Sequence, residues 1–568
     1  MACHDTRSFG RGYANYSELA GRYKMSDQHP WCTHYDPEVP AHLEYPDFTI
    51  QDFLERQAKS TPGRMALICD EKVLSYAELF SSSRNFAEHL VQLGLKPGDR
   101  VGICLPNTIE FVISYFGTLM AGGVVAAMNP YYPLPEWQYQ TKIVSPKILV
   151  GLSTRADELF ELKQKSGSDL LILVDVKTEQ QLFPKAYETV DFVTFEKCIS
   201  KSETQIKLPL VNSLSPAVLQ FSGGTTGLPK AALALHCNVA ANILQFTKWL
   251  TTLKQGEEVF LTVIPLYHVY GMVIGLNVGI AMGAAIVLVP DGKNLEKTLQ
   301  LIQEHKVTFF PGVPSIYQAI NRHPRVLAGE VNLSTIKACI SGSAPLLPET
   351  REQFEKLTGG KLVEGYGLSE APTATHCNPI QGENRNGSIG LPLPDVECKI
   401  VDLEDDSKTM AAGESGQLLI RSPQVMLGYF GSLSETEMVM KEDWLYTGDI
   451  AKMDEDGYFY LLGRLKELIK VNGLQVWPTE VEAVLVKHHK ISEAAVAGVN
   501  DDVTGEAVNA WVVMRDYAPL DPKDVQLFCR SSLAGYKIPK EIVAVEALPK
   551  SPIGKVLRRE LVKLHNKE

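Results

Sequence analysis

Hydrophobic and polar positions from Phe48 to Val289 follow two alternating patterns. Apolar residues at helical spacing predict helices at Ser75–Leu93 and Thr108–Ala121, and short apolar runs predict strands at Arg100–Leu105 and Gly123–Ala127. The same rhythm continues at Ile286–Val289, Leu295–His305 and Thr308–Pro311. Helices that alternate with strands predict an α/β fold in which parallel sheets carry helices on their faces.

The pattern changes in the last third of the chain. Gly387 to Arg421 has shorter strands separated by Gly, Pro and Asp turns, which predicts an antiparallel, β-barrel-like subdomain. Beyond Arg464, a helix at Pro478–Val486 and strands at Glu493–Gly498 and Ala507–Met514 predict a small α+β domain. No internal repeat or low-complexity tract interrupts this order.

Composition is that of an ordinary globular protein. A chain of 568 residues with 45% hydrophobic content is too long for one core and predicts at least two domains. The formal net charge of -12 argues against a nucleic-acid surface, which needs a basic stripe. A nucleotide such as ATP needs only a local cluster of cations, so it remains a candidate ligand.

Features that mark a cellular compartment favour the cytoplasm. The ten cysteines form no CxxC pair, and Cys69 and Cys104 sit in apolar runs, which favours a reduced protein with buried thiols. The first thirty residues contain no apolar signal-peptide core and predict a tether or loosely packed extension, and the final HNKE is not a peroxisomal address. The apolar stretches Val112–Met128 and Met272–Pro290 are rich in glycine and near or below the ~20 residues of a membrane span. They therefore predict buried helices and strands.

The segment Phe221 to Lys230, FSGGTTGLPK, carries the strongest chemical signal. Its glycines, hydroxyls and lysine directly follow the apolar run Ala217–Gln220, which is typical of a loop that leaves a strand. Glycine permits close backbone approach, so such a loop can offer N–H groups, hydroxyls and a cation to a polyphosphate. The common phosphate loop GxxxxGK[ST] is absent there. Alone, the segment could also be a surface turn.

Four later segments give this loop a context. They are EGYGLSE at Glu364–Glu370, YTGDI at Tyr446–Ile450, GRLKELIKVNGLQV at Gly463–Val476 and PKSPIGKVLRR at Pro549–Arg559. With the first loop, in this order and spacing, they resemble the adenylate-forming superfamily of acyl-CoA synthetases, luciferases and peptide-synthetase adenylation domains. The resemblance runs from about Trp31 to the last residues.

The resemblance implies an ATP site. Glu370 matches the magnesium carboxylate of the superfamily, which fits a hard cation held by one carboxylate and substrate phosphates. Positions that match the phosphate loop are Ser222, Gly223, Gly224, Thr225, Thr226, Gly227 and Lys230. Positions that match the adenosine and α-phosphate contacts are Gly342, Ser343, Ala344, Tyr366, Gly367, Ser369, Asp449 and Arg464. Gly223 stands where many relatives have serine, and Ala231 replaces a common glycine.

The resemblance also implies sites for the acyl group and for coenzyme A. His268 and Gly365 match the acyl pocket, although a histidine in an apolar stretch can also be a core residue. Lys555 matches the catalytic lysine of adenylation. Lys470 matches a residue of the thiol step and Gly473 the coenzyme A tunnel. Lys466 matches the hinge between steps.

These matches imply a domain layout. We expect an N-terminal extension at residues 1–47, an AMP-binding domain at 48–463, a hinge at 464–466 and a mobile C-terminal domain at 467–568.

The implied activity is acid–thiol ligation with ATP, magnesium and coenzyme A. WCTHYDPEVP and GSIGLPLPDVECKIVD resemble bacterial long-chain fatty acyl-CoA synthetases, so a medium- to long-chain fatty acid is the expected substrate. Aryl acids such as coumarate or benzoate, a ligase without coenzyme A, a luciferase and a non-catalytic relative stay as alternatives. A lipid substrate leaves peripheral membrane contact open, as it leaves open a monomer or a homodimer.

Overall fold

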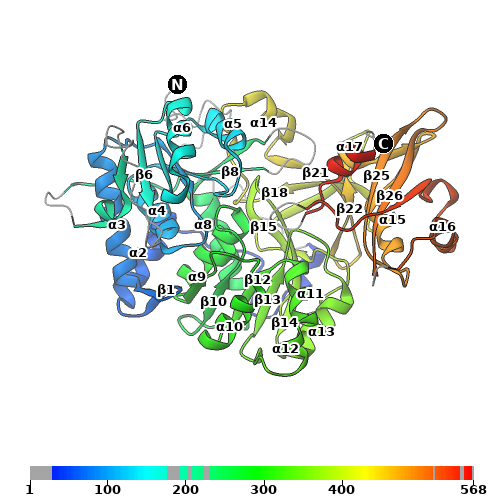
Figure 1. Cartoon of the computed structure of the whole chain (residues 1–568), viewed down its shortest axis with the longest axis horizontal. Coiled ribbons are helices and arrows are strands. Elements are labelled where there is room, and N and C mark those ends of the chain that lie inside the picture. Colours follow the sequence, from blue (N-terminus) through cyan, green and yellow to red (C-terminus); the bar gives the residue numbers. More distant parts are fainter. Residues whose placement is uncertain are drawn as a thin grey trace. The chain divides into compact units, whose positions relative to one another are not determined.

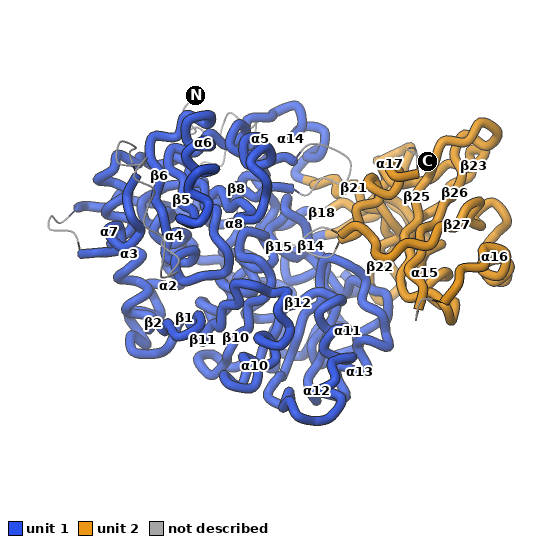
Figure 2. Tube along the Cα trace, in the orientation of Figure 1, with its two compact units in different colours: residues 1–223, 229–397, 421–443 blue, residues 224–228, 398–420, 444–568 orange. Residues whose placement is uncertain are grey.

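The computed structural model describes residues 29–174, 192–201, 206–222, 229–515, 518–550 and 555–565. Contacts along the chain divide it into two compact units (Figure 2). Unit 1 comprises residues 1–223, 229–397 and 421–443, and unit 2 comprises residues 224–228, 398–420 and 444–568. The chain therefore enters unit 2 more than once before it stays there.

One sheet of unit 1 is mainly parallel and has eight strands among the described residues. In spatial order they are β19 (Gly428–Tyr429), β9 (Ala231–Leu235), β8 (Pro216–Phe221), β4 (Val124–Ala127), β3 (Arg100–Cys104), β5 (Ile148–Leu152), β6 (Leu170–Val174) and β7 (Phe192–Thr194). From β8 to β7 all pairs are parallel, whereas β9 turns back antiparallel to β8. The parallel α/β architecture is thereby confirmed.

A second sheet of unit 1 has nine strands within the described ranges. Their order is β16 (Leu391–Pro392), β15 (Ala371–Cys377), β14 (Lys361–Leu368), β13 (Ala338–Ser341), β12 (Phe309–Gly312), β10 (Val259–Thr262), β11 (Ala285–Leu288), β1 (Met65–Cys69) and β2 (Lys72–Ser75). The strands from β14 to β1 pair in parallel, and antiparallel strands close both ends. Unit 1 also contains the short strand β20 (Met440–Lys441).

Most helices of unit 1 are labelled in Figure 1, and α7 is labelled in Figure 2. They are α2 (Ile50–Ser60), α3 (Tyr76–Gln92), α4 (Ile109–Met120), α5 (Leu134–Val144), α6 (Ala156–Ser166), α7 (Phe195–Ile199), α8 (His236–Trp249), α9 (Val278–Ala281), α10 (Leu295–His305), α11 (Pro314–Arg322), α12 (Pro324–Leu327), α13 (Pro348–Thr358) and α14 (Leu433–Val439).

Local sequence explains why two of these helices begin where they do. The Ser75 hydroxyl accepts a hydrogen bond from the Glu78 N–H, and the Glu78 carboxylate accepts one from the Ser75 N–H at 2.8 Å, which is a capping box. Thr108 caps α4 in a similar way by accepting from Phe111 N. The helix and strand ranges predicted between Ser75 and Pro311 agree with the structure to within one or two residues.

Both long apolar stretches are buried elements, as predicted. Val112–Met128 covers most of α4 together with β4, and Met272–Pro290 covers the π-helix η5 (Gly271–Asn277), α9 and β11. None of the described helices combines the length and apolar character that a membrane span needs. Eight of the nine cysteines in the described part of the chain are buried.

Unit 2 has two sheets, and antiparallel pairs predominate in both, with one parallel pair in the second. The first runs in the order β17 (Glu397–Val401), β18 (Ser415–Arg421), β21 (Trp444–Met453), and β22 (Phe459–Arg464) also pairs with β21. The range predicted for this sheet was incomplete in two ways. Its first strand, β16, joins the large sheet of unit 1, and β21 and β22 come from beyond Arg421.

The second sheet of unit 2 belongs to the predicted small α+β domain. Its strands are β24 (Leu474–Val476), β23 (Ile469–Val471), β26 (Gly505–Met514), β25 (Ile491–Asp501) and β27 (Glu541–Ala544). The helices of this unit are α15 (Pro478–Leu485), α16 (Pro522–Arg530) and α17 (Arg558–His565), with the short turn η6 (Leu465–Glu467). Ile469, Val481, Val496 and other buried apolar side chains fill its core. The predicted helix and both predicted strands are confirmed.

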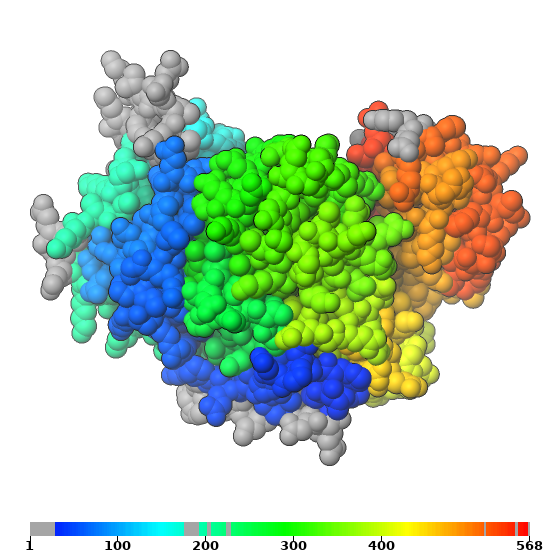
Figure 3. All heavy atoms as spheres, turned by 90° about the horizontal axis from the view of Figure 1, so that it is seen from below, coloured from blue at the N-terminus to red at the C-terminus, as the bar shows by residue number. Residues whose placement is uncertain are grey.

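The segment that follows residue 28 is packed on unit 1. Figure 3 shows it in dark blue along the surface of that unit. Trp31 is buried, and the buried Asp36 accepts hydrogen bonds from Thr251 Oγ1 and from the backbone N–H groups of Gln381 and Gly382. The tether predicted for the first thirty residues lies almost wholly outside the described residues.

Candidate active site

The predicted phosphate loop connects two paired strands. β8 ends at Phe221 and β9 begins at Ala231, and the pair is antiparallel. Ser222 N donates to the Lys230 carbonyl at 2.8 Å, which holds the two ends of the loop together. Gly223, Gly224, Thr225, Thr226 and Gly227 lie outside the described residues. Their phosphate contacts stay predictions, but the strand before the loop is confirmed.

Lys230 is held by side chains from a distant part of unit 1. Its ammonium forms an ion pair with Glu435, the third residue of α14, and lies 4.9 Å from the ring centroid of Tyr429. The same Tyr429 donates its hydroxyl to Glu370 Oε1 at 2.7 Å. One tyrosine thus contacts both the predicted phosphate lysine and the predicted metal carboxylate.

Glu370 lies in the two-residue turn between β14 and β15. Its carbonyl accepts from Met426 N at 2.8 Å, and the neighbouring Ser369 Oγ donates to the Phe221 carbonyl at 3.5 Å. The EGYGLSE segment therefore lies beside the first residue of FSGGTTGLPK, as the predicted site requires. Tyr429 and Glu435 were missed by the sequence analysis, because neither lies in a segment with a chemical signature.

Glu370 is the residue that the resemblance assigns to magnesium. No group of three or more His, Cys, Asp or Glu side chains that could hold a metal occurs in the described ranges. Glu370 offers a carboxylate with one hydrogen-bond donor on Oε1. Magnesium fits such a site, since it commonly takes one or two carboxylates plus substrate phosphates and water.

The remaining residues of EGYGLSE are set by the pairing of β14 with β15. Tyr366 pairs with His376, and their rings meet edge to face at 5.7 Å. A Cβ on Gly367 would lie 1.8 Å from the Thr373 carbonyl oxygen, so only glycine fits there. Tyr366 itself stays partly exposed, as a ring that stacks on a base must be.

Glu364 is a buried carboxyl that the sequence analysis did not single out. Its Oε2 accepts a hydrogen bond from Leu346 N at 3.2 Å. Burial raises the pKa of Glu364 to about 8, because water no longer solvates the charged form. The group is therefore mostly protonated at neutral pH and lies beside the turn that carries the predicted adenine residues.

Those predicted adenine residues, Gly342, Ser343 and Ala344, follow β13. Ser343 has a φ of 70°, in the left-handed region. A Cβ on Gly342 would lie 3.3 Å from the Tyr270 ring, and the Tyr270 hydroxyl donates to the Ile340 carbonyl at 2.8 Å. Tyr270 thus packs against Gly342 and is hydrogen-bonded to the strand that precedes this turn.

His268 lies two residues before that tyrosine. It is partly buried, and its Nδ1 accepts a hydrogen bond from Tyr270 N at 3.2 Å. This contact requires Nδ1 to be unprotonated, so any ring proton is on Nε2. Gly365, the other predicted acyl-pocket residue, lies on β14, where a Cβ would stand 3.3 Å from Ile340. The contact of either residue with an acyl group stays a prediction.

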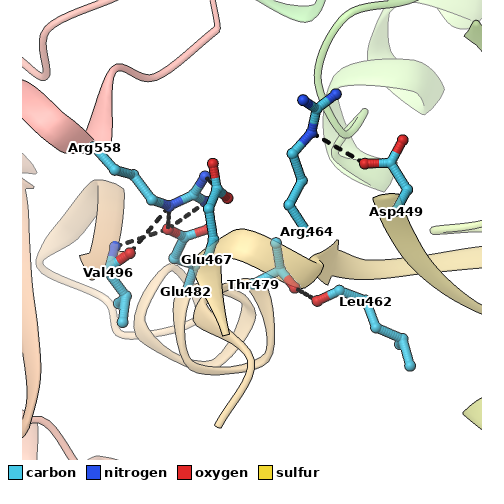
Figure 4. A network of polar contacts seen from close by, with 8 residues as sticks. All are labelled: Asp449, Leu462, Arg464, Glu467, Thr479, Glu482, Val496 and Arg558. Atoms are coloured by element: carbon cyan, nitrogen blue, oxygen red, sulfur yellow. Dashed lines mark hydrogen bonds and ion pairs between the residues drawn. The ribbon is translucent and has the colours of Figure 1, made fainter. Parts of the chain in front are cut away.

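In unit 2, Asp449 and Arg464 face each other across paired strands. They are register partners in β21 and β22, and Arg464 Nε lies 3.0 Å from Asp449 Oδ1 (Figure 4). Asp449 is buried at 4% exposure, and its N–H donates to Thr447 Oγ1 at 3.0 Å. The structure therefore joins the two residues that were predicted to contact the ribose.

Lys555 belongs to the same charged cluster. The pKa of Lys555 is lowered to about 8. Burial is the largest cause and the Arg464 and Arg558 cations add to it, while the Asp449 and Glu467 carboxylates oppose the shift. Ordinary surface lysines keep a pKa near about 10.4. A lysine with so low a pKa, near a carboxylate and an arginine, is typical of a functional site.

Lys470, Gly473 and Lys466 lie elsewhere in unit 2. Lys470 is exposed on β23, and a two-residue Asn472-Gly473 turn with positive φ at both positions joins β23 to β24. This is the turn that an Asn-Gly pair favours in a hairpin. Nothing lies within 4 Å of the place where a Gly473 side chain would begin. Lys466 is exposed in the middle of η6.

Two family models and several curated relatives match this chain. The AMP-binding enzyme family matches residues 54–430, and the AMP-binding enzyme C-terminal domain matches residues 480–555. The chain belongs to the AMP-binding enzyme family. A long-chain-fatty-acid–CoA ligase of Bacillus subtilis is 38% identical over 555 residues, which are 95% of this chain and 98% of the relative. A 4-coumarate–CoA ligase of Nicotiana tabacum is 32% identical over 536 residues, 93% and 95% of the two chains.

Solved structures agree with this family membership. ATP-bound MatB from Rhodopseudomonas palustris matches with a TM-score of 0.81 at 27% identity, over 91% of this chain and 99% of that one. O-succinylbenzoate coenzyme A synthetase from Bacillus subtilis, in complex with ATP and magnesium, matches with a TM-score of 0.76 at 25% identity, over 90% and 98% of the chains. This AMP-binding enzyme therefore has the fold of ligases that bind ATP.

Proposed function

We propose that this AMP-binding enzyme converts a medium- to long-chain fatty acid into its coenzyme A thioester by way of an acyl adenylate. The observation that carries the proposal is the cluster of Lys555 with Asp449 and Arg464 in one compact unit. Membership in the family and the full-length relative in Bacillus subtilis support it.

Two displacements make up the reaction. A carboxylate oxygen of the acid attacks the α-phosphorus of ATP, and the bond to pyrophosphate breaks. The thiolate sulfur of coenzyme A then attacks the acyl carbon, AMP leaves with the former carboxylate oxygen, and the thiol proton passes to solvent. The protein's task in the first step is to position two anions and to neutralise their charge.

Individual residues have separate tasks in this proposal. Asp449 accepts hydrogen bonds from the ribose hydroxyls, with Arg464 beside it, and Tyr366 stacks on adenine. Lys230 and the loop from Ser222 hold the terminal phosphates, while magnesium, when bound with ATP at Glu370, neutralises phosphate charge. Protonated Lys555 bridges the α-phosphate and the attacking carboxylate.

For the second step we propose that the C-terminal domain rotates about Lys466. Lys470 and Gly473 would then replace Lys555 at the acyl adenylate, with Gly473 leaving room for the pantetheine chain. Lys466 is exposed in a three-residue turn whose backbone is not part of a strand, which suits a pivot. The boundaries at residues 463 and 467 remain part of this proposal.

The acyl group decides between two candidate substrate classes. The 4-coumarate–CoA ligase relative gives the aryl alternative a basis, because it also spans nearly the whole chain. A long apolar tunnel should improve binding by up to ~0.8 kcal/mol for each added methylene until the tunnel is full. An aryl pocket should show no such series.

The decisive experiment measures AMP release with ATP, magnesium and coenzyme A. The panel contains fatty acids from six to eighteen carbons, coumarate and benzoate, with Lys555→Ala as the control for background. The proposal expects kcat/KM to rise with chain length and the thioester to appear in step with AMP. A flat response to chain length with efficient use of an aryl acid would favour the aryl alternative, and AMP release without thioester would contradict ligation to coenzyme A.

A further inference from the structure

Arg558 is the most heavily engaged cation near Lys555, and the reaction as proposed gives it no task. It is the first residue of α17, three positions after Lys555. Its Nη2 donates to both carboxylate oxygens of Glu482 at 2.8 Å, and its Nη1 donates to Glu467 Oε2 at 2.9 Å (Figure 4). Its Nε donates to the Val496 carbonyl at 3.0 Å and lies 3.2 Å from Glu482 Oε1.

These charges are largely removed from water. The side chains of Arg558, Glu467 and Glu482 are 17%, 11% and 16% exposed. A bidentate arginine–carboxylate pair fixes both distance and orientation, because the guanidinium is a planar fork. Loss of one partner leaves an uncompensated charge in a poorly solvated place, so the network holds its geometry firmly.

The partners of Arg558 come from three separate elements of unit 2. Glu482 lies in the middle of α15 and Val496 on β25, which both line the core of the small domain. Glu467 ends η6 and directly follows Lys466. A single guanidinium therefore ties the start of α17 both to the domain core and to the turn that carries the proposed pivot.

Backbone hydrogen bonds connect the position of Arg558 to that of Lys555. Val556 forms an antiparallel bridge with Lys550, and Leu557 N donates to the Pro549 carbonyl at 2.8 Å. The isolated bridge and this hydrogen bond hold the backbone between Lys555 and Arg558 against residues 549 and 550. The backbone that carries Lys555 is therefore anchored on its C-terminal side.

We propose that Arg558 is a positioning residue for adenylation, which holds Lys555 in register with the Lys466 turn through its simultaneous pairing with Glu467 and Glu482. This inference rests on the proposed function, because it assigns Arg558 to the half-reaction that Lys555 serves. It separates two roles of the network: Glu482 secures α17 to the domain, and Glu467 sets where Lys555 stands relative to the pivot.

Charge gives the proposal a second signature. Groups that face Lys555 are Arg464 on β22, Asp449 on β21, Glu467 on η6 and Arg558 on α17. The adenylation rate should fall at high pH as Lys555 loses its proton, and we call this fall the alkaline limb of the pH profile. Removal of the Glu467 charge should shift this limb to lower pH, because a carboxylate that favours the charged ammonium is lost. Removal of the Arg558 charge should shift it to higher pH.

The test compares Glu467→Gln, Arg558→Lys and Arg558→Gln with the wild type in the two half-reactions. Adenylation is followed by pyrophosphate release, and the second step by thioester formation from supplied acyl adenylate and coenzyme A. We expect Glu467→Gln, which keeps the Glu482 anchor, to lower adenylation about tenfold. The KM for ATP and the second step should stay within about twofold. Arg558→Lys should behave alike, since an ammonium cannot span both carboxylates in the same geometry.

Glu480→Gln is the matched control. Glu480 lies on α15, the helix of Glu482, and both of its carboxylate oxygens accept hydrogen bonds from Lys537 Nζ at 2.7 Å. This variant should leave the ratio of the two half-reactions and the pH profile unchanged. A proportional loss of both half-reactions in Glu467→Gln, with an unmoved alkaline limb, would overturn the positioning role. A wild type that releases no pyrophosphate with any acid would instead overturn the proposed function and this inference with it.

Discussion

Lys230 in unit 1 and Lys555 in unit 2 are both predicted to meet phosphate oxygens, yet their surroundings differ. Lys230 pairs with Glu435 at side-chain exposures of 33% and 37% and rests over a tyrosine ring. Lys555 stands among four charged groups from four elements, and its neighbour Arg558 is nearly buried. The first arrangement suits a cation that exchanges one anion for another. The second suits a cation whose position must be fixed before the substrate arrives.

The largest expected effect is that of Lys555→Ala on the first half-reaction. Removal of a cation aimed at charge in the transition state should lower adenylation by ~100-fold or more. Conversion of supplied acyl adenylate to thioester should remain near the wild-type rate. The measurements are pyrophosphate release for the first half-reaction and thioester formation from supplied acyl adenylate for the second. An equal loss in both would contradict the role assigned to Lys555.

Lys466→Pro should produce the opposite selectivity. Proline fixes φ near about -65° and restricts Leu465 as well, so the turn could no longer rotate. We expect substantial pyrophosphate release but loss of most thioester formation. Thioester formation at the wild-type rate would mean that the pivot is not at Lys466.

The pH dependence of adenylation should report on Lys555. The pKa of Lys555 is lowered to about 8, so its charge is present below that pH and is lost as the pH rises through it. The kcat/KM of pyrophosphate release should therefore fall about tenfold per pH unit above this pKa. Lys555→Arg, whose guanidinium stays charged, should show a flat alkaline limb at lower activity. A limb that survives this substitution would belong to another group.

Glu370→Gln tests the carboxylate side of unit 1. The amide keeps the shape and the hydrogen bond from Tyr429 but loses the charge that helps to hold magnesium. Adenylation should slow several-fold and need more magnesium for half-maximal rate. A magnesium titration that overlays the wild-type curve would exclude Glu370 from the metal site.

The smallest effect is expected for Glu435→Gln. Exposed ion pairs contribute about 1 kcal/mol or less, so the loss of the Lys230 partner should change stability little. A freed Lys230 should lower the KM for ATP by less than about threefold, because ATP no longer displaces a carboxylate. If this variant lost as much adenylation activity as Lys555→Ala, the proposed difference between Lys230 and Lys555 would be wrong.

Local sequence patterns predicted many of the helices and strands, whereas they did not predict which strands far apart in the sequence pair with each other. Leu295–His305 is a helix over its whole predicted range, because its Asn294 cap, its apolar spacing and its end agree. Strand pairing between β18 and β21 joins segments with no common local signal. The predicted sheet was therefore incomplete.

The candidate site divides in the same way. Asp449, Arg464 and Lys555 were found through their motifs, and the structure brings them together. Tyr429 lies 59 residues from Glu370, and Glu467 lies 91 residues from Arg558. A partner at such a separation is specified by tertiary packing, and one sequence contains no periodicity that points to it.

The path of the chain between the two units limits how this enzyme can be divided. Residues 398–420 belong to unit 2, the next segment returns to unit 1, and β21 in unit 2 then pairs with β18. A single cut between residues 443 and 444 would leave β18 on one fragment and β21 on the other, each with an unsatisfied edge. Open strand edges recruit other strands and promote aggregation. Domain exchange between relatives should therefore transfer residues 398–420 together with residues 444–568.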